Sequence, residues 1–300
     1  MVYGKLYDDT NYREAEGLQK LGVRIVFDLC DNHFYNPNEL VSLREAKDPL
    51  RRMMALADGL VASTEAMAEV MRSELSVPRH ITVIGDAVET EILGKKTPIW
   101  DGGWQRYQLK KLLDQLEIER RNGCTQLVWF GIHGGPNAEY GMLDLIKIKP
   151  LVERMHRCFP LSLTVISNSR IKFNRAIKPW RIPTRYLTWH PATFLSGLRA
   201  HTISLIPISD NPFTRCKSNV RLALSLQMGL AVVADSIASY QPFAKVCCLD
   251  DWERGLEGYL SHPDLRQRHV EAGRAILAKE WTGTHIANQW REYFEKLLAR

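Results

Sequence analysis

The stretch that decides the fold runs from Ile203 to Tyr240 and reads ISLIPISDNPFTRCKSNVRLALSLQMGLAVVADSIASY. Its apolar run over 202–207 predicts a buried strand, and a second apolar run over 230–234 predicts another. Between them, apolar side chains recur at helical spacing over 220–228. A strand, a helix and a strand in this order predict one unit of a parallel α/β layer.

The same alternation extends toward the N-terminus of this stretch. The sequence predicts strands over 126–130, 161–166 and 185–189 and helices over 142–158 and 193–200. Together these elements make a complete doubly wound domain, which we place at 101–283. An amphipathic helix over 284–300 follows, and its apolar stripe must pack on another part of the protein.

A smaller α/β series precedes this domain. Strands are expected over 23–29, 59–62 and 80–84, with helices over 12–21, 49–56 and 65–75. We assign 1–100 to this series and to an irregular connection that begins near Lys95. A chain of 300 residues is long enough for two such cores.

Composition narrows the classes of function. Hydrophobic residues make up 45% and charged residues 25%, which is typical of a folded globular protein. The net charge of +6 is scattered among acids, which argues against a nucleic-acid binder. The polar start and the absence of a run of about 20 apolar residues predict a cytoplasmic protein. A basic amphipathic helix around Leu109–Arg121 leaves two readings open, a surface helix or peripheral association with the inner face of the membrane.

The cysteines predict neither a metal site nor a disulfide framework. All six lie outside any C-x-x-C motif and outside the ladder of spacings seen in secreted proteins. We therefore expect reduced thiols and no bound metal.

In an open parallel sheet, ligands bind beyond the carboxyl ends of the strands, so the residues there are candidates for a site. Gly131, His133, Gly134 and Gly135 follow the strand at 126–130, and such a loop is either a plain turn or a cradle for a diphosphate. It has neither dinucleotide-binding nor Walker spacing.

Lys217, Ser218 and Asn219 stand directly before the helix over 220–228. A lysine and a hydroxyl at a helix N-terminus either bind an anion or provide an ordinary N-cap beside a solvated lysine. Parallel strands end at one sheet edge, so this segment is expected beside the glycine loop, which favours the anion.

Several motifs, in their order, resemble the glycosyltransferases of the GT-B type, family four. They are Ile203–Ile208, Lys217–Asn219, MGLAVVA at 228–234 and Ala238–Tyr240, preceded by DGLVAS at 58–63, VIGDAV at 83–88 and Trp129–Gly131. The terminal helix with Trp290 resembles the helix that crosses back to the N-terminal domain in that family. The resemblance implies a GT-B fold of two Rossmann-like domains whose N-terminal domain is incomplete here, because that half normally carries several strands before the one at Val23.

This resemblance implies a function. The C-terminal domain is expected to hold a nucleotide-sugar donor, and the N-terminal domain a glycan or lipid-linked glycan acceptor. No cofactor or metal is then required, since Lys217, Ser218 and backbone N–H groups stabilise the leaving diphosphate. A partner or a second copy is one source of the missing N-terminal half.

Further polar residues follow other strands. Asp31 and His33, near Asp28, either bind acceptor hydroxyls and move protons or simply form a turn. Asn168 offers a polar contact or a turn, and Trp189-His190 contacts the donor's base or belongs to the core. We take Asp31, His33 and Lys217 as the catalytic candidates.

Two family positions differ here. The family commonly carries two glutamates that contact the donor, and this sequence has Cys216 and Leu224 in their place. Two functions follow, a glycosyltransferase with a variant site or a non-catalytic sugar-nucleotide-binding or assembly protein. A nicotinamide-dependent oxidoreductase lacks its glycine fingerprint.

Overall fold

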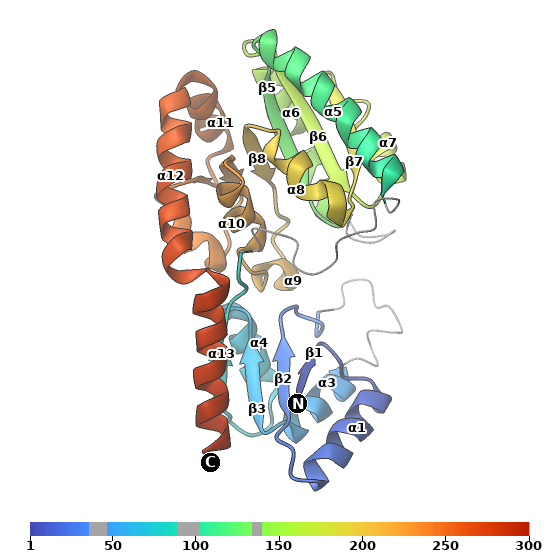
Figure 1. The fold of residues 1–300 in the computed structure, drawn as a ribbon, viewed down its shortest axis with the longest axis vertical. Helices are drawn as coiled ribbons and strands as arrows, with labels where there is room; N and C mark the ends of the chain where they lie inside the picture. The colour runs from blue at the N-terminus through green and yellow to red at the C-terminus, as the bar shows by residue number, and fades with distance from the viewer. Residues whose placement is uncertain (36–46, 89–101, 134–139, 300) are drawn as a thin grey trace.

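The computed structural model describes residues 1–35, 47–88, 102–133 and 140–299. Two parallel-sheet α/β domains are stacked end to end, with the C-terminal helix running along the side of the smaller one (Figure 1). The predicted fold class is confirmed. The connection expected to begin near Lys95, and the glycines Gly134 and Gly135, lie outside the described residues.

The larger domain carries six parallel strands in the order β10-β9-β8-β5-β6-β7. The strands are β5 (Thr125–Phe130), β6 (Leu161–Ser167), β7 (Thr184–Thr188), β8 (Ile203–Ile206), β9 (Ala231–Ala234) and β10 (Cys248–Leu249). The chain builds outward from β5 to β7, then returns to β8 beside β5 and continues in the opposite direction. This reversal is a topological switch point, where ligands bind in open α/β sheets.

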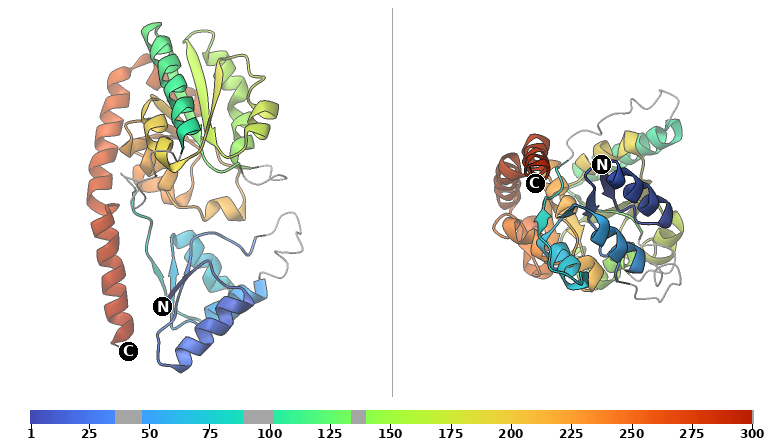
Figure 2. Two further views of the ribbon diagram at one scale, coloured as in Figure 1. Left: turned by 45° about the vertical axis from the view of Figure 1, so that its right-hand side comes forward. Right: turned by 90° about the horizontal axis from the view of Figure 1, so that it is seen from below.

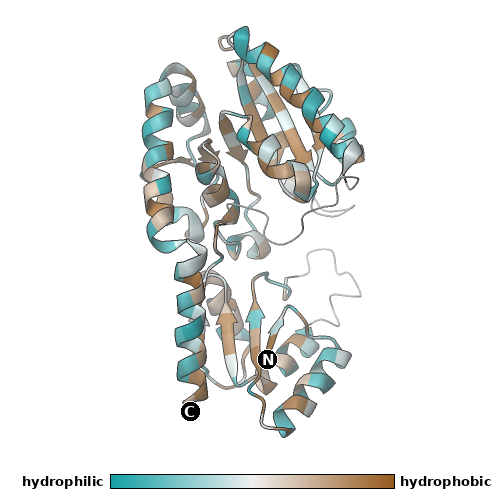
Figure 3. Ribbon diagram, viewed as in Figure 1, coloured by the Kyte–Doolittle hydropathy of each residue, from teal (hydrophilic) through white to brown (hydrophobic). Residues whose placement is uncertain are grey.

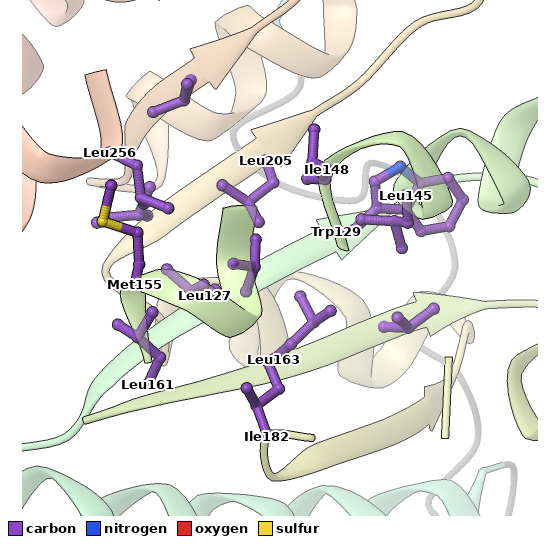
Figure 4. Packing of buried hydrophobic residues seen from close by; sticks show 14 of the residues in the cluster. Leu127, Trp129, Leu145, Ile148, Met155, Leu161, Leu163, Ile182, Leu205 and Leu256 are labelled. Carbon is purple, nitrogen blue, oxygen red and sulfur yellow. The ribbon is translucent and has the colours of Figure 1, made fainter. Parts of the chain in front are cut away.

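Alternation along β5 explains how the sheet is covered on both faces. Leu127 and Trp129 face one layer of helices, while Val128 and Phe130 face the other. Figure 4 shows Trp129 beside Leu145 in the first of these layers. β6, β8 and β9 are buried along their whole length and are largely apolar, with serines and a threonine interspersed in β6 and β8, as expected of strands covered on both faces (Figure 3).

The helices of this domain fall on the two faces of the sheet and around its edge. They are α5 (Gly103–Arg121), α6 (Leu145–Met155), α7 (Arg170–Ala176), α8 (Pro191–Arg199), α9 (Pro212–Arg215), α10 (Val220–Gln227), α11 (Trp252–Ser261) and α12 (Pro263–Glu280), with 3-10 turns η1 (Gly141–Asp144) and η2 (Ala238–Phe243). The single helix expected over 142–158 is instead η1 followed by α6. Buried Asp144 accepts a hydrogen bond from the Gly141 backbone N–H, which fixes the tighter first turn.

The smaller domain has four parallel strands in the order β1-β2-β3-β4. They are β1 (Val2–Gly4), β2 (Val26–Leu29), β3 (Gly59–Ala62) and β4 (Ile81–Val83), with helices α1 (Asp9–Lys20), α3 (Lys47–Leu56) and α4 (Glu65–Glu74) on one face. The expectation that no strand precedes the one at Val23 is wrong. β1 pairs with β2 in parallel, but it has three residues and buries only Tyr3, so it leaves no hydrophobic run to detect.

The C-terminal helix α13 (Gly283–Leu298) covers the other face of the smaller sheet. Ile286 and Leu297 pack on Val26 and Val61, so the last residues of the chain complete the first domain's core. Figure 2 shows α12 and α13 running one after the other along both domains. Within the described residues, no helix is both long and apolar enough to cross a membrane.

Candidate functional site

A pocket of about 500 Å³ lies at the switch point between β5 and β8. Gly131 and Ile132 enter it from the end of β5, and Ile208 enters from the end of β8. The smaller domain contributes Asp31 across the gap. The lining is completed by Tyr140, Gly141, Asp144, Phe213, Thr214, Lys217, Ser218, Val220, Arg221 and Tyr240. Four residues predicted to form the site, Asp31, Gly131, Lys217 and Ser218, therefore meet in one pocket.

An ion pair across the two domains closes one side of this pocket. Lys217 Nζ donates to Asp31 Oδ1 at 2.6 Å, and Lys5 Nζ binds the other carboxylate oxygen. Burial by itself raises the pKa of Asp31, but the two ammonium groups outweigh it and hold the pKa below its ordinary value. Asp31 is therefore a stable carboxylate and a poor proton acceptor. The Lys217 ammonium also lies 4.1 Å from the ring centre of Phe213.

The N-terminus of α10 is open toward ligands. Asn219 occupies the N-cap position, but its side chain makes no capping hydrogen bond, so the ordinary N-cap alternative is wrong for this residue. Unpaired N–H groups and the helix dipole at such a terminus favour an anion. Lys217 and Ser218 stand immediately before it.

Arg221, on the first turn of α10, is a second cation of the pocket that sequence reasoning missed. A side chain at Gly131 would place its Cβ 3.7 Å from the Arg221 guanidinium and 3.4 Å from the Trp129 ring. Gly131 also has a φ of 153°, which L side chains rarely adopt. Arg221 follows Lys217 by four residues at the start of a helix, a spacing that can bring two side chains to the same side, and this could have identified it from the sequence.

Asp144 is an acid in the pocket that the sequence did not single out. It is 3% exposed, and its carboxylate accepts hydrogen bonds from the Gly141 N–H at 2.8 Å and from the Ser209 hydroxyl. Lys147 Nζ lies 3.7 Å away. Asp144 therefore ties the segment after β5 to the segment after β8 and shapes the pocket wall.

Neither residue in the family's glutamate positions lines the pocket. Cys216 is 2% exposed and packs in the core of the smaller domain, where its backbone carbonyl accepts a hydrogen bond from Thr64 Oγ1 at 3.0 Å. Leu224 packs between α10 and the α5–α8 layer. Both side chains serve packing, and an ionised glutamate at either position would lose much of its hydration.

His33 lies close to Asp31 but does not line the pocket. Its Nδ1 is 3.0 Å from the Tyr7 hydroxyl. Burial lowers the pKa of His33, and the nearby Lys5 and Lys217 lower it further against the opposing effect of Asp31. The imidazole is therefore neutral near pH 7 and able to accept a proton.

Asp28, on β2, is a partly buried acid with a strongly altered pKa. Burial, followed by the nearby Asp86 carboxylate, raises the pKa of Asp28 to about 6 from an ordinary 3.8. The folded protein thus holds this proton more tightly than the unfolded chain. The resulting stabilisation is present below about pH 4 and is lost as the pH rises through 6.

Replacing Asp28 by asparagine is expected to raise the melting temperature at pH 8 and to change it little at pH 5. The uncharged amide removes the cost of a buried carboxylate, which we put at about 1 kcal/mol after allowing for partial exposure. Calorimetry at both pH values measures the difference. The exposed Asp114→Asn is the control, and an equal gain at both pH values would contradict the assignment.

The other predicted site residues that the structure describes lie outside this pocket. Asn168 Oδ1 accepts a hydrogen bond from the His133 N–H at 3.1 Å and so supports the backbone after β5. Trp189 is 46% exposed, and His190 caps α8 through a hydrogen bond from the Ala192 N–H. Asn219 lines a different pocket, together with Ser218.

No protein-family model matches the sequence, and no curated protein is similar to it in sequence. Solved structures resemble the fold. TarM gives a TM-score of 0.59 at 12% identity, over 93% of this chain and 53% of that one. WaaG, a glycosyltransferase involved in lipopolysaccharide biosynthesis, gives a TM-score of 0.59 at 13% identity, over 94% of this chain and 83% of WaaG. Anabaena HepE in complex with UDP and glucose gives a TM-score of 0.64 at 14% identity, over 94% of this chain and 74% of HepE.

The chain thus spans about half of TarM and larger shares of the other two. At these identities the likeness concerns the fold. The chain therefore has the GT-B fold of group 1-like glycosyltransferases.

Proposed function

We propose that the chain binds a nucleotide sugar in the switch-point pocket and transfers its sugar to a glycan or lipid-linked glycan. The observation that carries this proposal is the convergence of Lys217, Ser218, Arg221 and the open N-terminus of α10 on one pocket, opposite Gly131. Two cations and unpaired N–H groups suit a diphosphate. HepE, which shares the fold, was solved with UDP and glucose.

The chemistry follows from these charges. Breaking the bond between sugar and diphosphate leaves an oxocarbenium-like sugar and a diphosphate with added negative charge. Lys217, Arg221 and the helix N-terminus are already fixed where that charge grows, so they stabilise the transition state more than the ground state. Because they supply the positive charge, the proposal needs no metal ion. The incoming hydroxyl must also lose its proton; His33, whose side chain does not line the pocket, stays only the sequence-based candidate for accepting it.

The bond between Lys217 and Asp31 has a consequence for binding. A diphosphate must compete with the Asp31 carboxylate for the Lys217 ammonium, while Lys5 continues to neutralise Asp31 after release. In the ligand-free protein, Asp31 therefore occupies part of the anion site.

Replacing Asp31 by asparagine is expected to tighten nucleoside diphosphate binding by about fivefold, since it removes a competitor worth about 1 kcal/mol. Isothermal titration measures the Kd. Asp210→Asn, which removes an exposed acid paired with Arg215, should leave the Kd unchanged. Weaker binding in Asp31→Asn would show that the carboxylate supports the ligand.

The buried, uncharged state of Cys216 and Leu224 favours a second function. Without these carboxylates the protein could hold a sugar nucleotide and catalyse nothing, as a non-catalytic binding or assembly protein. Lys217 and Arg221 would serve both functions equally, so only a measurement of turnover separates them.

A thermal-shift panel of nucleoside diphosphates and nucleotide sugars tests the proposal. A ligand at 100 times its Kd adds about 2.7 kcal/mol to stability. A shift followed by donor hydrolysis or sugar transfer supports the transferase. A shift with no turnover on any donor supports the binding protein, and no shift with any nucleotide refutes both.

A further inference from the structure

The positive charge of the chain is concentrated in one stretch of sequence. Between Glu153 and Asp210 there is no aspartate or glutamate, whereas nine lysines and arginines occur there. The whole chain has a net charge of +6, so this stretch contributes +9 and the remaining residues −3. The average over the chain hides this bias. It concentrates positive potential over the elements that the stretch forms, from the last turn of α6 to the end of β8.

Helix α7, at the outer edge of the sheet, exposes part of this charge. Phe173 is buried against the sheet, so the opposite side of the helix faces solvent. Arg175 and, just after the helix, Lys178 are exposed, and neither makes an ion pair with any residue that the structure describes. Ile171 lies one helical turn before Arg175 and is 82% exposed. An aliphatic side chain thus stands in water beside two unpaired cations.

The first turns of α5 form a second group of similar composition. Trp104 and Tyr107 are 64% and 51% exposed, and their rings stack with centres 5.5 Å apart. Lys111 Nζ lies 5.5 Å from the centre of the Tyr107 ring, and Lys110 is also exposed. The sequence over 103–113 contains no acid. This end of α5 therefore presents aromatic rings and cations together.

Both groups border β7, the edge strand of the six-stranded sheet. Arg170, the first residue of α7, lies over the Tyr186 ring of β7 at 4.9 Å. The start of α5 approaches the end of β7, since a Cβ at Gly102 would lie 2.8 Å from the His190 ring. Figure 1 shows α5 and α7 on one side of the larger domain and α12 on the opposite side. The two groups make up the β7-edge surface, which consists of Trp104, Tyr107, Lys111, Ile171, Arg175 and Lys178.

We propose that the β7-edge surface binds a lipid bilayer that contains anionic lipids. Its cations lie at the lipid phosphates, while Trp104, Tyr107 and Ile171 enter the boundary between headgroups and acyl chains. Tryptophan and tyrosine favour this boundary because their rings are apolar and carry one polar group. A nucleic acid or another polyanion would use the same cations but leave Ile171 in water, so this side chain favours the bilayer. None of these residues lines the switch-point pocket, so the inference does not depend on the proposed function.

The test is co-sedimentation of the full chain with vesicles made of equal parts of phosphatidylcholine and phosphatidylglycerol, and with vesicles of phosphatidylcholine alone. We expect binding to the anionic vesicles only, and weaker binding as salt is added. In Arg175→Gln/Lys178→Gln the partition coefficient should fall about 25-fold, since each cation at an anionic surface contributes about fivefold. The matched control, Arg268→Gln/Lys279→Gln, removes two exposed cations of α12 and should bind as the wild type does.

The apolar contribution is tested separately with Trp104→Ser/Ile171→Ser. This variant keeps every charge, and the loss of two inserted side chains should weaken vesicle binding about tenfold. All the substituted side chains are exposed, so the melting temperatures of the variants should match that of the wild type and show that each is folded.

Three results would overturn the inference. The first is that the wild type does not bind the anionic vesicles. The second is vesicle binding that survives in Arg175→Gln/Lys178→Gln or falls equally in the α12 control. The third is unchanged vesicle binding in Trp104→Ser/Ile171→Ser together with retention on heparin or RNA, which would assign the surface to a polyanion.

Discussion

Replacing Lys217 by alanine is expected to weaken nucleoside diphosphate binding by about 10- to 100-fold. A hydrogen bond to a charged group contributes about 1.5–3 kcal/mol, and Lys217 provides one of the two cations of the switch-point pocket. At a nucleotide concentration near ten times the wild-type Kd, the stabilisation by ligand should therefore fall from about 1.4 kcal/mol to below about 0.4 kcal/mol. Isothermal titration gives the Kd directly.

The matched control for this experiment is Lys245→Ala, which removes an exposed lysine outside the pocket. Both variants lose one positive charge, so an effect of net charge alone would weaken binding in Lys245→Ala as well as in Lys217→Ala. Unchanged binding in Lys217→Ala would refute the placement of the diphosphate. The variant also breaks the bond to Asp31, so its melting temperature without ligand has to be measured alongside.

Replacing Trp129 by alanine is expected to destabilise the larger domain by about 3–5 kcal/mol. Trp129 is fully buried on β5 and packs against α6, and its ring supports Gly131 at the edge of the pocket. The cavity left behind would also loosen the residues after β5. Differential scanning calorimetry measures the loss of stability, and a nucleotide titration measures the accompanying loss of affinity.

Trp129→Phe separates the contribution of ring packing to stability from the cost of the buried indole N–H. The indole N–H of Trp129 is buried without a hydrogen-bond partner in the described structure, so its removal offsets part of the lost volume. We expect a cost below about 1.5 kcal/mol, as for conservative changes of shape. A large loss in Trp129→Phe would mean that the N–H has a partner, and a small loss in Trp129→Ala would contradict the packing argument. Exposed Trp104→Ala is the control.

Much of the fold could be read from the sequence because hydrophobic spacing is local. β3 spans Gly59–Ala62 as predicted, and β5, β6 and β8 differ from their predictions by one or two residues. β1 was not predicted, because three residues with one buried side chain carry no periodic hydrophobic signal. Asp144 was not predicted as a pocket residue, because the sequence does not show that its carboxylate is buried or which groups bind it.

The stretch from Ile203 to Tyr240 shows which features local sequence determines and which depend on the tertiary structure. By itself it determined a strand, a helix and a strand, with Lys217 and Ser218 at a helix N-terminus, since these depend on neighbours within a few residues. Only the tertiary structure decided that Lys217 meets Asp31, 186 residues away, that Cys216 packs in the other domain's core and that Asn219 faces a second pocket. These contacts depend on how the two domains dock against each other, and no local periodicity encodes that arrangement.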